Sequence, residues 1–193
     1  LTVSSGNVSR GYNGTLAAAG VASVTSGTLY SNASNGNTQD SLSGGIFAFT
    51  DANAGTGKTV TVSGVTMNDG NSGNNYNVTY ADNTSSTITR ALLQVTANSL
   101  LKDSGEIIVF TGTEFTTAGT FYGSDSIDSV TLTSVGASAS AGANGSPYSI
   151  TPSGAVGGGL TNYAISYVDG YLTVNPPTAL PPVVLAALTP PVV

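Results

Sequence analysis

Residues 52–59 form the first segment whose residue types could do chemistry. Their sequence, Ala-Asn-Ala-Gly-Thr-Gly-Lys-Thr, satisfies a relaxed phosphate-loop pattern with alanine in place of the first glycine. Such a loop must follow a buried strand and open a helix, because the N-terminal amides of that helix bind the phosphate. Lys58 and Thr59 instead begin a segment in which Thr and Val alternate. We therefore expect a turn between two strands here, and no bound nucleotide.

Two other loops carry the oxygen ligands and tight turns that calcium sites use. They begin at Asp51 and at Asp69 and are rich in Asn, Gly and Ser. A calcium ion takes six to eight oxygen ligands, usually including two or more carboxylates, whereas each of these loops supplies one. We expect no cofactor, and keep calcium at the Asp51 or Asp69 loop as the alternative.

Glu114, Asp125 and Asp128 are the acids from which a glycosidase pair could be drawn, since cleavage of a glycosidic bond needs two carboxylates. The chain has no His and no Cys, which removes the commonest general base and the thiolate ligands of metals. We interpret the three acids as solvated loop residues. The sequence predicts that the protein is not an enzyme.

Nine tyrosines and five phenylalanines raise the alternative of carbohydrate stacking. Four of the tyrosines recur at a spacing of four, which places them on one face of a strand and favours core or core-edge packing; they are Tyr76, Tyr80, Tyr163 and Tyr167. Tyr30 and Tyr122 lie beside glycine and polar loops, and we expect them to be the exposed contact aromatics.

Five Asn-X-Ser/Thr sequons make glycosylation a further possibility. Chance produces several sequons in a chain so rich in Asn, Ser and Thr, yet exposed ones on a secreted protein can accept glycans. The candidate acceptors are Asn7, Asn13, Asn32, Asn77 and Asn83.

Composition narrows the function classes. Only 7% of the 193 residues are charged, and four basic residues face ten acidic ones, so the chain lacks the basic patch that nucleic acid requires. Without cysteine no disulfide can form, and a Cys-free β chain rich in Gly, Thr and Asn fits a bacterial exoprotein better than a secreted eukaryotic module. No run of 18 apolar residues and no leader at Leu1 are present, so we expect no membrane insertion and a segment of a longer exported chain.

A repeated pattern supplies the framework that must position these residues. Asn, Tyr, a β-branched residue, Tyr and Asp occur with one spacing in residues 75–82 and again 87 residues later in 162–169. This shared register predicts two related domains in tandem. Within the second copy, Asp169-Gly170 is typical of a two-residue turn and predicts a hairpin over residues 162–174.

The start of the second domain follows from a second match. Leu93-Gln94-Val95 repeats Leu1-Thr2-Val3 at an offset of 92, which favours a strand over the helix that the leucines of residues 90–102 would also allow. We expect strands at 46–49, 59–67, 76–80, 84–89, 106–111, 129–134 and 148–150 as well. The predicted domains are residues 1–91 and 92–175, joined without a flexible linker. Six of the eight prolines fall in residues 176–193, which predicts an extended linker or tail.

Several segments resemble a known pair of modules. Residues 11–15, 55–65 and 75–76 resemble the YDG domain of large bacterial surface exoproteins, and residues 112–115, 129–134, 145–152 and 162–174 resemble its usual companion, the MBG ("mostly β, glycine-rich") domain. Two departures concern loops: Asn13 replaces the usual Asp of the first signature, and residues 102–105 lack the usual aromatic of the second. The resemblance implies repeat modules of filamentous-haemagglutinin-like adhesins, which bring no catalytic residues with them.

The sequence thus predicts an all-β protein of two tandem immunoglobulin-like β-sandwich domains with a Pro-rich C-terminal extension. The expected function is a non-catalytic stalk or spacer in a secreted bacterial adhesin, acting in attachment or biofilm at the cell surface or in the extracellular matrix. Its expected partners are neighbouring repeat domains, other copies of itself or extracellular polysaccharide. Two alternatives stay open: a self-assembling filament or matrix subunit, in which strand edges or the apolar tail pair with a neighbouring copy, and a carbohydrate-binding module.

Overall fold

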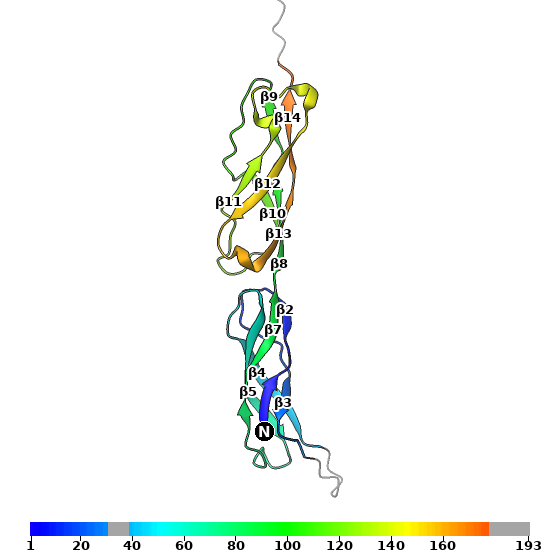
Figure 1. Ribbon diagram of the computed structural model, residues 1–193, viewed down its shortest axis with the longest axis vertical. Helices are drawn as coiled ribbons and strands as arrows, with labels where there is room; N and C mark the ends of the chain where they lie inside the picture. The colour runs from blue at the N-terminus through cyan, green and yellow to red at the C-terminus, as the bar shows by residue number, and fades with distance from the viewer. Residues whose placement is uncertain (31–38, 178–193) are drawn as a thin grey trace, which may run out of the picture. The chain divides into compact units, whose positions relative to one another are not determined.

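The computed structural model describes residues 1–30 and 39–177, and the regular secondary structure of the described chain is almost wholly β-strand (Figure 1). The predicted all-β class is confirmed. The predicted tail lies almost wholly outside the described residues, as does Asn32. The strands of the first half are β1 (Thr2–Ser5), β2 (Ser9–Gly11), β3 (Ala22–Ser26), β4 (Ser41–Phe49), β5 (Gly55–Asn68), β6 (Thr79–Tyr80) and β7 (Asn83–Thr89).

The second half contains seven more strands and three short 3-10 turns. The strands are β8 (Ala91–Ala97), β9 (Leu100–Asp103), β10 (Phe115–Gly119), β11 (Ser129–Thr133), β12 (Tyr148–Val156), β13 (Tyr163–Val168) and β14 (Gly170–Asn175). The 3-10 turns are η2 (Val135–Ala137), η3 (Ala143–Gly145) and η4 (Leu160–Asn162). None of the helices among the described residues is long and apolar enough to span a membrane.

The two halves repeat one topology. In the first half a three-stranded sheet in the order β3-β1-β6 accompanies a four-stranded sheet in the order β2-β7-β5-β4. In the second half the corresponding sheets are β10-β8-β13 and β9-β14-β12-β11. Each strand of the first half therefore matches the strand seven places later, and β2 and β9 both pair in parallel with the last strand of their half. We call residues of β1–β7 the first sandwich and residues of β8–β14 the second.

Alternating strand residues supply the buried side chains between the sheets. In the first sandwich Val3, Phe49, Val60 and Ile88 are all at most 1% exposed. Buried aliphatic side chains of the second come from β8, β11, β12 and β14; they are Leu93, Val95, Ala97, Val130, Leu132, Ile150, Leu172 and Val174. These β-branched and aliphatic residues suit a pleated surface that is buried on one face.

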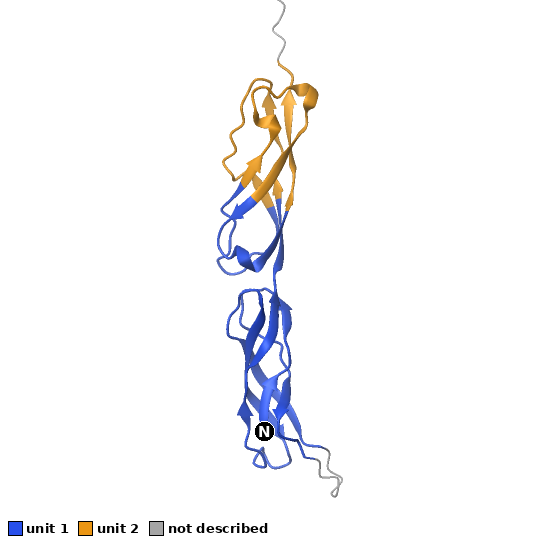
Figure 2. Ribbon diagram, viewed as in Figure 1, with its two compact units in different colours: residues 1–95, 117–130, 154–166 blue, residues 96–116, 131–153, 167–193 orange. Residues whose placement is uncertain are grey.

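Division by contacts gives two compact units (Figure 2). The first comprises residues 1–95, 117–130 and 154–166; the second comprises residues 96–116, 131–153 and those from 167 onward. The first unit therefore contains the whole first sandwich together with parts of β8, β10, β11, β12 and β13. The domain limits of residues 91, 92 and 175 follow the sequence repeat instead, and they stay a prediction.

The predicted hairpin over residues 162–174 is wrong. β13 belongs to the sheet of β8, and β14 belongs to the sheet of β12 and β9, so the chain crosses from one sheet to the other between them. A two-residue hairpin turn of this type needs positive φ at its central residues, and neither Asp169 nor Gly170 has one. Gly170 instead lies where a Cβ would overlap the carbonyl oxygen of Ala97.

Two smaller strand predictions also change. Residues 106–111 form no strand: Ile107 and Val109 are exposed, and Ile108 donates one backbone hydrogen bond to Ala137. The expected strand 76–80 is reduced to β6, because the chain from Asn71 to Tyr76 makes tight turns. The strand interpretation of residues 90–102 is confirmed, and Arg90 alone separates β7 from β8.

Candidate functional site

The predicted glycan acceptors lie at different degrees of exposure. Asn7, Asn13 and Asn77 are exposed. Asn83 is half-buried, and its amide nitrogen donates to the Ser5 carbonyl at 3.2 Å and to Asn7 Oδ1 at 2.9 Å. The nitrogen of Asn83 to which a glycan would attach is therefore engaged within the fold. Glycosylation at these positions stays a prediction.

The two predicted contact aromatics differ in their surroundings. Tyr30 is 70% exposed, and its ring lies 6.1 Å from that of Tyr76. Tyr122 is half-buried, and its ring meets the ring of Tyr12 edge-on at 5.6 Å. Tyr80 and Tyr167, expected in the core or at its edge, are 44% and 39% exposed and lie outside the core, whereas Tyr163 is buried.

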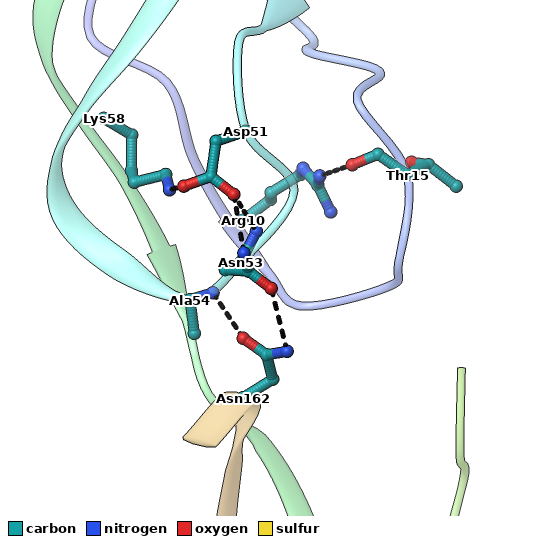
Figure 3. A network of polar contacts seen from close by, with 7 residues as sticks. All are labelled: Arg10, Thr15, Asp51, Asn53, Ala54, Lys58 and Asn162. Carbon is teal, nitrogen blue, oxygen red and sulfur yellow. Dashed lines mark hydrogen bonds and ion pairs between the residues drawn. The ribbon is translucent and has the colours of Figure 1, made fainter. Parts of the chain in front are cut away.

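The carboxylates of the two candidate calcium loops accept hydrogen bonds from the protein. Asp69 accepts from the backbone amides of Asn71, Gly73 and Asn75, and these bonds, with that of Gly73 first, hold its pKa below the ordinary value. Asp51 accepts from Lys58 and from the backbone and side chain of Asn53 (Figure 3). N–H donors, which repel a cation, are thus aimed at both carboxylates. Among the described residues no three side chains of His, Cys, Asp or Glu lie close enough together to hold one metal ion.

The three acids considered for glycoside hydrolysis have separate structural partners. Glu114 accepts from the amides of Thr111, Gly112 and Thr113 and from the Thr111 hydroxyl. Burial alone would raise its pKa, but these bonds to the charged form outweigh burial and lower the pKa to about 2. Asp128 accepts from the Ser126 hydroxyl at 2.9 Å.

Asp125 is the centre of a tyrosine cluster inside the first compact unit. Its Oδ2 accepts from the hydroxyl of Tyr12 at 2.8 Å and from the hydroxyl of Tyr163 at 3.0 Å. The Tyr163 oxygen accepts in turn from the backbone amide of Tyr122 at 2.9 Å. One carboxylate therefore joins the loop after β2 to the start of β13, more than a hundred residues apart in the chain.

Burial and the neighbouring carboxylate keep both phenols protonated. Desolvation, followed by the hydrogen bond to Asp125, raises the pKa of Tyr12 to about 12. Desolvation also raises the pKa of Tyr163, although the amide of Tyr122 opposes it. Because only a protonated phenol can donate to Asp125, the cluster is intact across the ordinary pH range.

Asn162 forms a second link beside this cluster (Figure 3). Its side chain is 3% exposed. The carbonyl oxygen accepts from the backbone amide of Ala54 at 2.9 Å, and the amide nitrogen donates to Asn53 Oδ1 at 3.1 Å. Asp51 accepts from Asn53 and pairs with Lys58, and these contacts fix the side chain of Asn53 in the loop between β4 and β5 where it contacts Asn162.

An apolar cluster lies beneath the two polar links. Its buried members come from both sandwiches; they are Val8, Tyr12, Phe49, Val60, Ile88, Leu93 and Tyr163. Arg10 lies over the Phe49 ring, 5.0 Å from its centroid, which is close enough for a cation–π contact. Aromatic rings and hydrogen-bonded amides thus pack together inside the first compact unit.

Two known domain families match the sequence. The YDG domain matches residues 1–86, and the MBG domain of the YGX type matches residues 93–173. The chain is a YDG domain followed by an MBG domain. Searches among curated proteins and among solved structures found no match.

The links described above thus join the YDG domain to the MBG domain. Tyr12, Asn53 and Ala54 belong to the YDG domain, and Asp125 and Asn162 belong to the MBG domain. We call this contact the YDG–MBG junction. Only Arg90 separates the last YDG strand from the first MBG strand, so the covalent connection between the two domains is a single residue.

In the sequence, most junction residues stand out for other reasons. The sequence predicts that Asp125 is a solvated loop acid and that Asn162 begins a hairpin, and Tyr12 enters only within the YDG-like segment 11–15. A signal was present in the repeat, because Asn162 and Tyr163 have counterparts in Asn75 and Tyr76. The partner of Tyr12 could not be found this way, since it lies more than a hundred residues further along the chain.

Proposed function

We propose that this chain is a non-catalytic spacer segment of a large secreted bacterial adhesin, acting in attachment or biofilm at the cell surface or in the extracellular matrix. Two β-rich domains of a kind used in extracellular repeat regions support the proposal. The observation that carries it is the YDG–MBG junction. Its buried polar links and one-residue connection restrict bending between successive domains, which is what a spacer requires.

Composition supports the same role. A surface with few charges, built largely of Ser, Thr, Asn and Gly, offers no strong electrostatic attraction to unrelated molecules. Its interactions should therefore change little with salt concentration. In this proposal the partners of the chain are neighbouring repeat domains, and specific binding resides in other parts of the adhesin.

Replacement within the parent adhesin tests the spacer role. Deleting residues 1–175 should reduce attachment of cells, and inserting an unrelated pair of β-sandwich domains of equal length should restore it. A spacer needs length and stiffness, whereas a binding module needs its own side chains. Failure of the unrelated pair to restore attachment would contradict the proposal.

Two further measurements address the alternatives. Binding of the full chain to a glycan array, lost on Tyr30→Ala, would favour a carbohydrate-binding module. Sedimentation that shows polymerisation of the wild-type chain with rising concentration, lost when the Pro-rich tail is removed, would favour a self-assembling filament or matrix subunit.

A further inference from the structure

The YDG domain carries a second copy of the surface that the MBG domain uses at the junction. Tyr122 and Tyr163 match Tyr30 and Tyr76 at the two repeat offsets, 92 and 87. We call Tyr122, Asp125, Asn162 and Tyr163 the Tyr163 pole. We call the set Tyr30, Asp40, Asn75 and Tyr76 the Tyr76 pole. Both sets lie in the first compact unit.

Three hydrogen bonds of the Tyr163 pole recur in the Tyr76 pole. The backbone amide of Tyr30 donates to the Tyr76 hydroxyl oxygen at 2.8 Å, as Tyr122 does to Tyr163 at 2.9 Å. The Tyr76 hydroxyl donates to Asp40 Oδ2 at 2.7 Å, as Tyr163 does to Asp125 at 3.0 Å.

The third bond joins the acid to the first tyrosine of each pole. The amide of Asp40 donates to the Tyr30 carbonyl at 3.0 Å, and that of Asp125 donates to the Tyr122 carbonyl at 3.2 Å. Tyr30 and Asp40, and Tyr122 and Asp125, lie at different separations in the sequence, yet both pairs reproduce one arrangement of a carboxylate and two tyrosines.

The two poles differ in what covers them. Asp125 accepts a second phenol, that of Tyr12, and the ring of Tyr12 packs edge-on against both tyrosines of the Tyr163 pole. Among the described residues, Tyr76 is the only side chain that donates to the Asp40 carboxylate. Tyr30 is 70% exposed, whereas its counterpart Tyr122 is half-buried beneath Tyr12.

We propose that the Tyr76 pole is a docking site for the C-terminal end of another YDG domain, placed ahead of this one in a repeat array. The Tyr12 hydroxyl of the incoming domain donates to Asp40, and its ring packs on Tyr30 and Tyr76. The proposal rests on the duplicated geometry, so it holds whether the array serves as a spacer or in another role.

The other domain type offers a poorer occupant. Ser104 holds the place of Tyr12 in the MBG domain, because its amide donates to Asn175 as that of Tyr12 donates to Thr89. A serine side chain lacks the ring and the reach of a tyrosine. The Tyr76 pole therefore discriminates in favour of a YDG domain over an MBG domain at its C-terminal end.

A chain with a joined copy tests the proposal. Residues 1–92 are placed directly ahead of Leu1, so that Leu1 takes the place that Leu93 has at the native junction. The joined copy carries Tyr30→Phe, which leaves the original Tyr30 as the reporter. Nitration by tetranitromethane, read by mass spectrometry, should modify Tyr30 rapidly in the unaltered chain. In the joined chain Tyr30 should react as slowly as Tyr122.

Two variants of the joined chain identify the contact. Tyr12→Phe in the joined copy alone removes the hydroxyl and should restore part of the reactivity, while the native junction keeps its own Tyr12. A joined MBG copy, residues 93–177, should leave Tyr30 reactive. The proposal is overturned if Tyr30 reacts equally in the unaltered and joined chains while Tyr163 stays protected, or if the MBG copy protects Tyr30 equally.

A second variant covers failure of the joined copy to fold, which circular dichroism would reveal. Ser104→Tyr in the chain of natural length offers a tyrosine to Asp40 of a second molecule. Sedimentation should then show association that rises with concentration, and Asp40→Asn should abolish it. Absence of association in that variant overturns the proposal.

Discussion

The first and second sandwiches share every strand pairing but differ where loops meet at their ends. The sheet orders correspond strand for strand, yet the position of Tyr12 is Ser104 in the second sandwich and that of Gly170 is Asn83 in the first. Strand order depends on the alternation of buried and exposed residues, which many sequences satisfy. The ends are where the two domains acquire different contacts.

A pair of cations illustrates this division. Arg10 and Lys102 occupy matching positions beside β7 and β14. The Arg10 guanidinium donates to the carbonyls of Gly11 and Thr15, and the Lys102 ammonium donates to the carbonyls of Glu106 and Ser138. In each case one cation donates hydrogen bonds to backbone carbonyls of the loops at the end of its sandwich.

The largest effect should come from Gly170→Ala in the second sandwich. A Cβ there would overlap the Ala97 carbonyl at the end of β8 in the other sheet, and backbone cannot move aside as a side chain can. We expect a loss of about 4 kcal/mol in the free energy of unfolding, the upper end for one substitution. Urea denaturation measures it, and amide exchange shows whether β14 opens first.

Asn83→Ala is the matched control in the first sandwich. The position already accommodates a side chain, so the change causes no overlap. It removes the bonds that the Asn83 amide donates to Ser5 and Asn7 and those that its oxygen accepts from Ser85 and Ser86. A loss of about 2 kcal/mol is expected. Equal losses for Gly170→Ala and Asn83→Ala would contradict the explanation by overlap.

Asp125→Ala should have the second largest effect, because the carboxylate of the Tyr163 pole accepts from two phenols and that of the Tyr76 pole accepts from one. It leaves the buried hydroxyls of Tyr12 and Tyr163 without their acceptor, at a cost of about 3 kcal/mol. Asp40→Ala strands one half-buried hydroxyl, that of Tyr76, at a cost of about 1 kcal/mol. Thermal unfolding compares the two variants, and a larger loss for Asp40→Ala would contradict the comparison.

The repeat, the all-β class and the direct connection of the two domains can be predicted from the sequence, because they depend on local patterns. Matching triplets at residues 1 and 93 outweighed the helical spacing of the leucines. The role of Gly170 was missed, since Asp-Gly is typical of a turn and its close approach to Ala97 is a contact between distant segments. For the same reason Asp125 was interpreted as a solvated acid, although its two phenol donors come from residues 12 and 163.

Lowering the pH should weaken the second sandwich through Glu114. Its pKa is lowered from 4.5 to about 2, so its stabilising effect is complete above pH 4.5 and is lost as the pH falls through about 2. Bonds to a charged acceptor of this kind contribute about 2 kcal/mol. Amide exchange at residues 111–113 should accelerate over that range, and Glu114→Gln should remove the acceleration. Exchange that is equally pH-dependent in the variant would exclude Glu114 as the cause.

Ser72→Gly should have the smallest effect, and it should be stabilising. Ser72 has φ of 56°, a left-handed conformation that costs a side chain about 1 kcal/mol, and its counterpart Gly159 has φ of 70°. Glycine at residue 72 relieves that cost but adds freedom to the unfolded chain, so a net gain of about 0.5 kcal/mol is expected. The reverse exchange, Gly159→Ser, should destabilise, because a Cβ there would overlap the Asp125 carboxylate that holds the junction. If both variants shifted the urea midpoint in the same direction, backbone conformation and space would not be what distinguishes the two turns.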